Sequence, residues 1–527
     1  MYTSAVLLAA LSTPLLASLL ALLAGSRRPG LVGRLGVAAA GAGFAASCLT
    51  AVEVLLHGPV RATLRTGQGA TIAEVGADRL SALLLVLVFG VSTVVQLFAL
   101  RYLACDKRSG WFTAGTGLLT AASAGLMISG TLIGLALCWT MAGTALCLLL
   151  ATYWELPAAR DGVRRTATAF ALGDLALWSA VALVTTQWGN RSLTELTGIR
   201  DASPTMLVAA VLIVVAALSR SAQIPFHRWL PATLAAPTPV SALLHAGVVN
   251  AGGVLLVRLS PIVSGSALAM GIAFAAGMLS MVYGALVMLT KSDIKGSLAY
   301  STMAQMGFMI LTCGLGLSAA AVFHLVGHGF YKATLFLSSG SAIAKQRQKA
   351  ARPPAPPLSR TRRAAVLVSA MLLPAAALYA AGAVMPLHTA EHGSAEALVI
   401  FTWATAAAAL MGWLARSPHW PAVFAAGVAL LGAGVGYLAL VNLVTGFLSP
   451  DLPPVAVPSA SSLGIAAAAV VLGALALLRQ APPDGWMGRL QRALYTKALV
   501  AGHVSAVRPQ QIPTPTHLTA QLTGALR

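Results

Sequence analysis

The stretch that decides the fold of this chain runs from residue 219 to residue 257 and reads SRSAQIPFHRWLPATLAAPTPVSALLHAGVVNAGGVLLV. It places prolines, arginines and histidines together in a very apolar surrounding. Proline removes a backbone donor and interrupts a helix. Interrupted backbone and ionisable side chains are tolerated at membrane depth only inside protein or beside water, and they mark ion routes. The stretch therefore predicts a broken membrane helix that serves transport, with the break at Pro237 and Pro239.

The composition agrees with a membrane protein. Of the 527 residues, 58% are hydrophobic and only 9% are charged, and the mean hydropathy is +0.82. Soluble domains are about a quarter charged. The apolar residues form blocks of roughly 20 residues, which is the length that crosses a bilayer core. We predict an all-α polytopic membrane protein with about 15 transmembrane helices, at residues 3–24, 31–55, 80–100, 111–130, 132–153, 166–187, 204–222, 233–258, 266–289, 297–316, 319–342, 363–384, 397–415, 421–446 and 461–478.

The net charge of +20 follows the predicted topology. In a soluble protein such a charge would indicate nucleic acid as a partner. Here the basic residues follow the odd-numbered spans, whereas segments on the other side, such as residues 449–460, carry no Lys or Arg. Basic residues favour the cytoplasmic side of a membrane. We therefore expect the N-terminus outside, the C-terminus in the cytoplasm, the lipid bilayer as a partner and no nucleic acid.

Three titratable residues stand in one column of a predicted span. His324, His328 and Lys332 are each four residues apart, and a helix stacks such positions on one face. Imidazole can both donate and accept a proton, so the column predicts a proton path. Two alternatives stay open. The histidines could serve hydrogen bonds between helices, or a metal site could use the His-x-x-x-His spacing, although no carboxylate or thiolate nearby completes it.

Four further ionisable residues are candidates for the same path. His245 and Arg220 belong to the interrupted stretch, and Lys295 leads directly into the span at 297–316, from which it could reach inward. Asp174 lies within the span at 166–187. A carboxylate there is a candidate ion-pair partner for a buried cation, with a purely structural role as the alternative.

Two segments are predicted to lie outside the membrane. Residues 344–363 form a basic, Pro-rich loop, which is either a solvated linker or a docking surface for a soluble partner or anionic lipid. After Pro483 the chain spaces Trp486, Leu490 and Leu494 four residues apart beside basic residues. This spacing predicts an amphipathic helix on the cytoplasmic face, over about residues 484–500.

Four segments, in this order, resemble the large antiporter-like subunits of respiratory complex I and of Mrp-type cation/proton antiporters. They are DRLSALLL at 78–85, QIPFHRWLP with APTPVSALLH at 223–245, KSDIKGSLAYSTMAQMG at 291–307 and HGFYKATLFL at 328–337. The resemblance implies two inverted five-helix repeats, each containing a broken helix, and a central line of Lys and His that carries protons. It also implies that His245 is the histidine of the broken helix and Lys332 the lysine of the second repeat.

Two substitutions set the chain apart from that family. The family has a Trp-Glu pair in its fifth span, where this chain has Trp139 and Thr140, and it has a lysine where this chain has Arg220. Arginine stays protonated at any relevant pH, so it cannot release a proton as lysine does. The strings HAGVVNAGGVLL at 245–256 and ALGDLAL at 171–177 resemble the DabB-type membrane subunits of DAB inorganic carbon accumulation systems.

This resemblance implies a function that residue patterns alone do not reach. It implies a subunit of the bacterial inner membrane that conducts protons or another cation and drives CO2 hydration and bicarbonate accumulation by a cytoplasmic, zinc-containing, carbonic-anhydrase-like partner of the DabA type, in a hetero-oligomer. The alternatives are a pump or antiporter subunit of a complex I-like, hydrogenase-linked or Mrp-type complex, and a scaffold that has lost conduction. We expect no catalytic centre, cofactor or metal in this chain, and zinc only in the partner.

The predicted organisation has five parts. These are N-terminal helices at 1–110, a first antiporter-like repeat at 111–260, a second repeat with the basic loop at 261–415, C-terminal helices at 416–480, and an amphipathic segment with a tail at 481–527.

Overall fold

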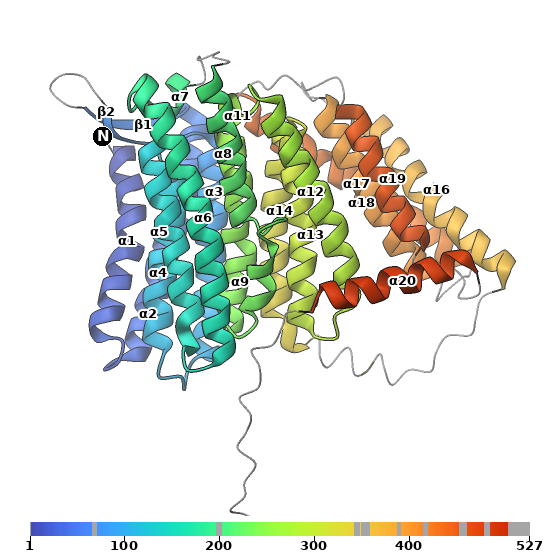
Figure 1. Ribbon diagram of the computed structural model, residues 1–527, viewed down its shortest axis with the longest axis horizontal. Coiled ribbons are helices and arrows are strands. Elements are labelled where there is room, and N and C mark those ends of the chain that lie inside the picture. The colour runs from blue at the N-terminus through green and yellow to red at the C-terminus, as the bar shows by residue number, and fades with distance from the viewer. Residues whose placement is uncertain are drawn as a thin grey trace, which may run out of the picture.

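The fold is a row of roughly parallel helices that ends in a tilted C-terminal group (Figure 1). A computed structural model describes residues 2–65, 71–196, 203–341, 348, 359–386, 392–414, 420–452, 461–478 and 485–503. Most of the predicted loop at 344–363 and the tail after residue 503 lie outside these residues.

The N-terminal part contains six long helices and one hairpin. The hairpin is antiparallel, pairs Val60 with Ala77, and follows α2 directly. The elements are α1 (Tyr2–Ala24), α2 (Pro29–His57), β1 (Val60–Arg65), β2 (Thr71–Ala77), α3 (Arg79–Tyr102), α4 (Ser109–Ile128), α5 (Leu132–Leu150), η1 (Ala151–Tyr153) and α6 (Pro157–Trp188).

The middle of the chain holds the interrupted stretch. It consists of several pieces rather than one long helix, and α9, η3 and α10 among them are almost entirely buried. They are α7 (Leu193–Leu196), α8 (Pro204–Arg220), η2 (His227–Thr233), α9 (Thr238–Ala246), η3 (Val248–Asn250), α10 (Ala251–Arg258) and α11 (Ser260–Val263).

Three helices complete the core, and five more form the C-terminal part. The core helices are α12 (Ala267–Met288), α13 (Ile294–Gly314) and α14 (Ser318–Leu337). The C-terminal helices are α16 (Arg360–Val384), α17 (His392–Leu414), α18 (Trp420–Leu448), α19 (Ser461–Leu478) and α20 (Trp486–Ala501).

The helices confirm an all-α, multi-pass membrane protein. Each predicted span coincides with a helix or, at 233–258, with an interrupted one. Among the described residues, ten helices are long and apolar enough to cross a membrane. The helices α8 and α17 contribute shorter apolar segments, Pro204–Arg220 and Val399–Leu414. The count of about 15 spans therefore stays a prediction.

Side chains that cap helix starts explain several helix boundaries. The carboxylate of Asp78 accepts the backbone N–H of Ser81 at the start of α3, and Thr131 accepts that of Gly134 at the start of α5. Asp293 does the same for Gly296 at the start of α13. Each cap satisfies a backbone donor that the first helical turn leaves without a partner.

Helices α12 and α13 approach each other closely in the core. A Cβ at Gly277 would lie 2.6 Å from the backbone oxygen of Gly307, and a Cβ at Gly307 would lie 2.6 Å from that of Gly277. Glycines at such a crossing let the two backbones come into van der Waals contact. This contact helps to hold membrane helices together, because the hydrophobic effect does not drive helices together within lipid.

The C-terminal helices stand beside the core as a separate group (Figure 1), and they are fastened to it at two ends. At one end, the carboxylate of Asp451 accepts the backbone N–H of Arg79 at 2.9 Å. At the other, the predicted amphipathic helix is present as α20 and lies across the ends of the neighbouring helices (Figure 1). Lys291 donates from Nζ to the backbone oxygen of Gly502 at 2.5 Å, just beyond α20.

The interruption in the broken stretch differs from the predicted one. Pro237 caps the start of α9 and Pro239 lies in its first turn. Both stand where a helix does not use the backbone N–H, so they start a helix instead of breaking one. The break lies further on, between α9 and α10, at residues 247–250.

The second half of the chain also differs from the implied pattern. The helix α16 contains Pro374 and continues through it. Among the described residues of the predicted second repeat, every long helix is continuous, so a second broken helix is not found there. The inverted relation of the two repeats stays a prediction.

Candidate functional site

The column on α14 lies at the centre of the core. His328 is 4% exposed and Lys332 is fully buried, and the rings of His324 and His328 have centroids 5.8 Å apart. The ammonium of Lys332 donates to the hydroxyl of Ser301 on α13 at 2.9 Å. A buried cation needs such a partner, because burial without one is costly.

His245 meets this column from α9. Its ring is 1% exposed and stacks on Phe336 with centroids 4.3 Å apart. Its Nδ1 lies 3.0 Å from the hydroxyl of Thr302, which itself donates to the backbone oxygen of Leu298 at 2.9 Å. Because that hydroxyl proton is already used, Thr302 accepts, and Nδ1 of His245 carries the proton.

A second hydrogen bond joins the two buried histidines. Nε2 of His328 lies 3.2 Å from the backbone oxygen of His245. A carbonyl oxygen can only accept, so Nε2 of His328 carries a proton, and in the neutral ring Nδ1 is then an acceptor. Helices α9, α13 and α14 thus hold both imidazoles in defined tautomers around the ammonium of Lys332.

Ser301 and Thr302 were not predicted as site residues. They are adjacent on α13, where the hydroxyl of Ser301 accepts a hydrogen bond from Lys332 and the hydroxyl of Thr302 accepts one from His245. The available signal was their position six and seven residues after Lys295, which puts them about two helical turns deeper in the same span.

Lys295 lies at the start of α13, and its part in the path stays a prediction. Its ammonium donates to the backbone oxygens of Ala236, at 2.9 Å, and Leu234, at 3.5 Å. These oxygens belong to the connection that leads into α9, so Lys295 ties this connection to the start of α13. It also lines an open pocket of about 1020 Å³ together with Tyr102 and Asp293.

Arg220 and Asp174 form a pair of their own. Nη2 of Arg220 lies 2.9 Å from Oδ1 of Asp174, and the arginine side chain is 1% exposed. The guanidinium lies 4.4 Å from the ring centroid of Trp139 and 4.1 Å from that of Phe170. Nε1 of Trp139 also donates to Asp174, at 2.8 Å. Stacking and pairing together hold the charge in one orientation.

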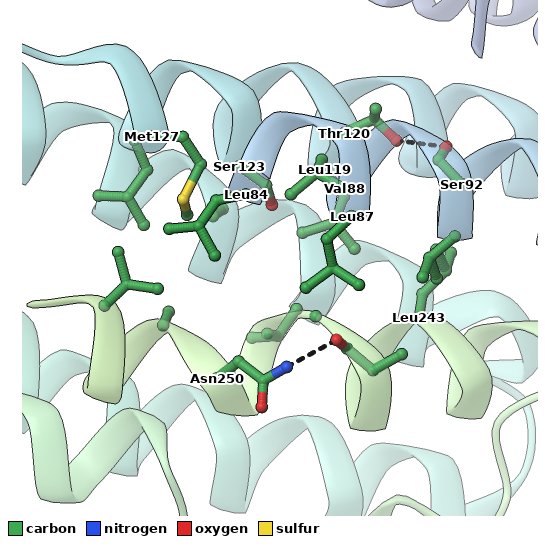
Figure 2. A pocket seen from close by; sticks show the side chains of 18 of the residues that line it. Leu84, Leu87, Val88, Ser92, Leu119, Thr120, Ser123, Met127, Leu243 and Asn250 are labelled. Atoms are coloured by element: carbon green, nitrogen blue, oxygen red, sulfur yellow. Dashed lines mark hydrogen bonds between the residues drawn. The ribbon is translucent and has the colours of Figure 1, made fainter. Parts of the chain in front are cut away.

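A small chamber lies beside this pair and the break in the α9–α10 stretch (Figure 2). It has about 60 Å³ of free space, and both Arg220 and Gly247 line it. Figure 2 shows Leu84 and Leu87 on one wall facing Asn250 on the other. The walls are mostly apolar, and apolar cavities hold water poorly. The chamber therefore gives the break room to move and offers little support for a proton.

The described residues contain no group of three or more His, Cys, Asp or Glu side chains placed to hold a metal ion. Of the seven residues predicted for the path, the structure brings His245, His328 and Lys332 together, with His324 one turn away. It places Arg220 with Asp174, and Lys295 at the edge of the core.

Two family models match the chain. Residues 129–353 match the transmembrane family of NADH:quinone oxidoreductase and Mrp antiporters, and residues 73–113 match the N-terminus of chain 5 of NADH-ubiquinone oxidoreductase (complex I). The first match covers α5 to α14 and contains the whole buried column. Helices α16 to α20 lie beyond it.

Several characterised proteins are similar over about half of the chain. The probable inorganic carbon transporter subunits DabB1 and DabB2 of Halothiobacillus neapolitanus (strain ATCC 23641 / c2) are 36% and 37% identical, over 51% and 54% of this chain. The matches cover 50% and 53% of those proteins, so the chain spans about half their length. The NAD(P)H-quinone oxidoreductase chain 5 of Picosynechococcus sp. (strain ATCC 27264 / PCC 7002 / PR-6) is 34% identical over 50% of this chain and 41% of its own length.

Solved structures share the fold. The Mrp complex from Dietzia sp. DQ12-45-1b contains a chain that matches 99% of this chain and 62% of its own length, with a TM-score of 0.63 at 24% identity. The membrane-bound sulfane sulfur reductase, an archaeal respiratory membrane complex, contains a chain that matches over 95% of this chain and 100% of its own length, with a TM-score of 0.59 at 16% identity. Over residues 129–353, which are less than half of its length, this chain is similar to the antiporter-like membrane subunits of complex I and Mrp complexes.

Proposed function

We propose that the chain is the proton- or cation-conducting membrane subunit of an inorganic carbon transporter. One observation carries the conducting role: His245, His328 and Lys332 lie buried in direct hydrogen-bond contact with one another or with neighbouring hydroxyls. Ionisable groups at this depth are costly and mark ion pathways in membrane proteins. Imidazoles with one donor and one acceptor nitrogen can pass a proton along the column.

The inorganic carbon assignment rests on the similarity to DabB1 and DabB2. In the proposed complex, the ion gradient drives CO2 hydration and bicarbonate accumulation by a cytoplasmic, zinc-containing, carbonic-anhydrase-like partner of the DabA type. Catalysis and zinc belong to that partner, and this chain supplies the ion path.

The proposed location is the bacterial inner membrane, with the N-terminus outside and the C-terminus in the cytoplasm. The basic residues after alternate spans support this orientation. The proposed division keeps the first repeat at 111–260 and the second at 261–415. Residues 1–110 and 416–480 flank the repeats, and the segment 481–527 lies at the cytoplasmic face.

A growth experiment tests the proposal. The chain is expressed with the gene of its soluble neighbour in bacteria that lack carbonic anhydrase, and growth in air is measured. We expect growth that needs both genes and collapses with an uncoupler. No growth, with the complex shown to be assembled in the membrane, would contradict the inorganic carbon role.

The second candidate is a pump or antiporter subunit of a complex I-like, hydrogenase-linked or Mrp-type complex. The 34% identity to an NAD(P)H-quinone oxidoreductase chain favours it. The Arg220–Asp174 pair argues against it, because a fixed arginine cannot release a proton. Co-purification of this chain with quinone-binding or hydrogenase-type subunits would favour the pump or antiporter role over the inorganic carbon role.

A further inference from the structure

An open pocket lies at the end of the core where α3 and α14 finish and α13 begins. It has about 1020 Å³ of free space, which is the size of a ligand site. Its lining comes from the last turns of α3, from residues 337–341 and from residues 292–295. Of the described residues that line it, none belongs to the buried column on α14. The pocket is therefore a feature separate from the proposed ion path.

One side of the pocket is apolar and borders the lipid-facing surface of α3. Phe98 and Leu337 line the pocket, and the neighbouring Val94 and Leu97 are exposed apolar side chains. Exposed apolar surface of this kind marks contact with a membrane. Tyr102 at the end of α3 stacks on Phe98, with ring centroids 5.6 Å apart, and tyrosine is enriched at the level of the lipid headgroups. The pocket thus lies where a headgroup and the first part of an acyl chain can reach it.

The other side of the pocket carries two opposite charges that do not neutralise each other. Asp293 is exposed and Lys295 is half-buried, and among the described residues no ion pair joins them. The ammonium of Lys295 has three donors, of which the backbone oxygens of Leu234 and Ala236 take two. The carboxylate of Asp293 accepts the backbone N–H of Gly296 and can accept further hydrogen bonds. One donor and one acceptor, both charged, are thus left for a ligand.

These features together select one class of ligand. A water-soluble anion would leave the apolar wall uncovered and would meet the charge of Asp293. An anionic lipid would cover the wall but would meet the same repulsion. Phosphatidylethanolamine satisfies all three features, because its phosphate accepts from Lys295, its ammonium donates to Asp293 and its acyl chain covers Phe98 and Leu337. Charge-assisted hydrogen bonds of this kind are about twice as strong as neutral ones.

We infer that this pocket binds the headgroup of a zwitterionic aminophospholipid, with the phosphate at Lys295 and the ammonium at Asp293. Ser292 and Ser339 line the same pocket and offer hydroxyl donors to the phosphate. The bound lipid joins the ends of α3, α13 and α14, and through Lys295 it supports the connection that leads into α9. It binds independently of ion conduction, because none of these contacts involves the buried column.

Lipid titration of the assembled, delipidated complex tests the headgroup. Phosphatidylethanolamine and phosphatidylglycerol are added separately at rising concentration, and the bound lipids are counted by native mass spectrometry. We expect phosphatidylethanolamine to bind about threefold more tightly, since its ammonium gains an exposed carboxylate as partner. Equal affinities or a preference for phosphatidylglycerol would overturn the aminophospholipid assignment. Tight binding of neither lipid would show a pocket filled by solvent and would also overturn it.

Two variants of the charged residues assign the binding to this pocket. Asp293→Asn removes the charge and keeps the helix cap, because asparagine caps a helix as well as aspartate does. We expect it to abolish the preference for phosphatidylethanolamine, whereas Glu155→Gln, at an exposed acid outside the pocket, should keep it. Lys295→Gln keeps a donor for the backbone oxygens and should weaken both lipids about tenfold. An unchanged preference in Asp293→Asn would place the lipid elsewhere and overturn the inference.

A third variant tests the pocket by its shape. A side chain at Gly340 would meet nothing within 4 Å, and Gly340 lines the pocket, so Gly340→Trp fills the pocket without a clash. Gly271→Trp on α12 is the matched control, since its site is equally open and lies outside the pocket. We expect only Gly340→Trp to abolish tight binding of phosphatidylethanolamine. Equal binding in the two variants would overturn the inference.

Discussion

Nε2 of His328 lies 3.2 Å from the backbone oxygen of His245, although the two residues are 83 positions apart. The contact joins α14 to the last turn of α9, directly before the break at residues 247–250. A movement of the break would therefore change the hydrogen bond that sets the tautomer of His328. This geometry connects the break in the interrupted stretch with the titratable column.

Lys332→Ala is expected to abolish function while the complex stays assembled. The change removes the buried ammonium that donates a hydrogen bond to the hydroxyl of Ser301. Proton transfer that loses one of its transferring groups slows by about 100-fold or more. The measurement is proton flux in vesicles together with the yield of the complex. Lys332→Arg serves as the control for charge, because arginine keeps the charge and cannot release a proton. Normal flux in Lys332→Ala would indicate a scaffold without conduction.

Thr302→Val is expected to remove the hydrogen bond that fixes the tautomer of the His245 ring. It removes the hydroxyl that accepts from Nδ1, and an unpaired buried donor costs about 1–3 kcal/mol. We expect ¹⁵N NMR of labelled histidine to show a mixture of tautomers at His245, with reduced flux. Thr302→Ser should restore both readouts. The matched control is Thr312→Val on the same helix, where the buried hydroxyl donates only to the backbone of Met309. An unchanged NMR spectrum in Thr302→Val would contradict the assignment.

Asp174→Ala is expected to destabilise the protein by about 3 kcal/mol, because it leaves the charge of Arg220 buried without its carboxylate. The double variant Asp174→Ala/Arg220→Met should recover most of this loss, since an apolar pair of similar volume needs no charge partner. Thermal unfolding of the purified complex measures both. If the double variant is stable but conducts no ions, the pair belongs to the path; if it conducts normally, the pair is structural.

Gly252→Ala is expected to disturb the contact between α10 and α8. A Cβ at Gly252 would lie 2.2 Å from Oγ of Ser221 and 2.5 Å from the backbone oxygen of Ala217. Overpacking of this kind costs about 1–3 kcal/mol. The control is Gly271→Ala on α12, where a Cβ would meet nothing within 4 Å. A lower unfolding temperature only in Gly252→Ala is the expected result, and equal temperatures would show that the two helices can separate at little cost.

Lys291→Met is expected to free the end of α20. The ammonium of Lys291 donates to the backbone oxygen of Gly502, and Tyr283 donates to that of Ala501 at 3.0 Å. Loss of a charged hydrogen bond of this kind costs about 1.5–3 kcal/mol, so local opening should rise about tenfold or more. Trypsin cleavage after Lys497 in inside-out vesicles measures this opening. Lys107→Met, at an exposed lysine after α3, is the control, and equal cleavage rates in the two variants would contradict the anchoring role.

Local patterns in the sequence were enough for much of the architecture. The apolar blocks predicted the positions of the helices, and the four-residue spacing on α14 predicted a shared face for His324, His328 and Lys332. The spacing of Trp486, Leu490 and Leu494 predicted α20. These features depend on helical period and hydropathy, which neighbouring residues set among themselves.

The prolines show where this reasoning was misled. Two prolines so close together suggested a break in a helix. Pro237 and Pro239 instead lie at the beginning of α9, where proline is favoured because the first turn does not use its backbone N–H. Whether a proline starts or interrupts a helix depends on where the preceding helix ends, and η2 ends at Thr233, before Pro237. The sequence position of Lys295 likewise does not reveal its contacts with the backbone oxygens of Leu234 and Ala236, and its part in the path stays a prediction.

The sequence by itself determined that this is a helical membrane protein with a titratable column on one helix face. Only the tertiary structure decided which groups surround that column: Thr302 and Ser301 from α13, and the oxygen of His245 from α9. The physical reason is the reach of each interaction. Helical period and hydropathy act within a few turns, whereas the tautomer of a buried histidine is set by a single atom that the fold brings from a distant segment.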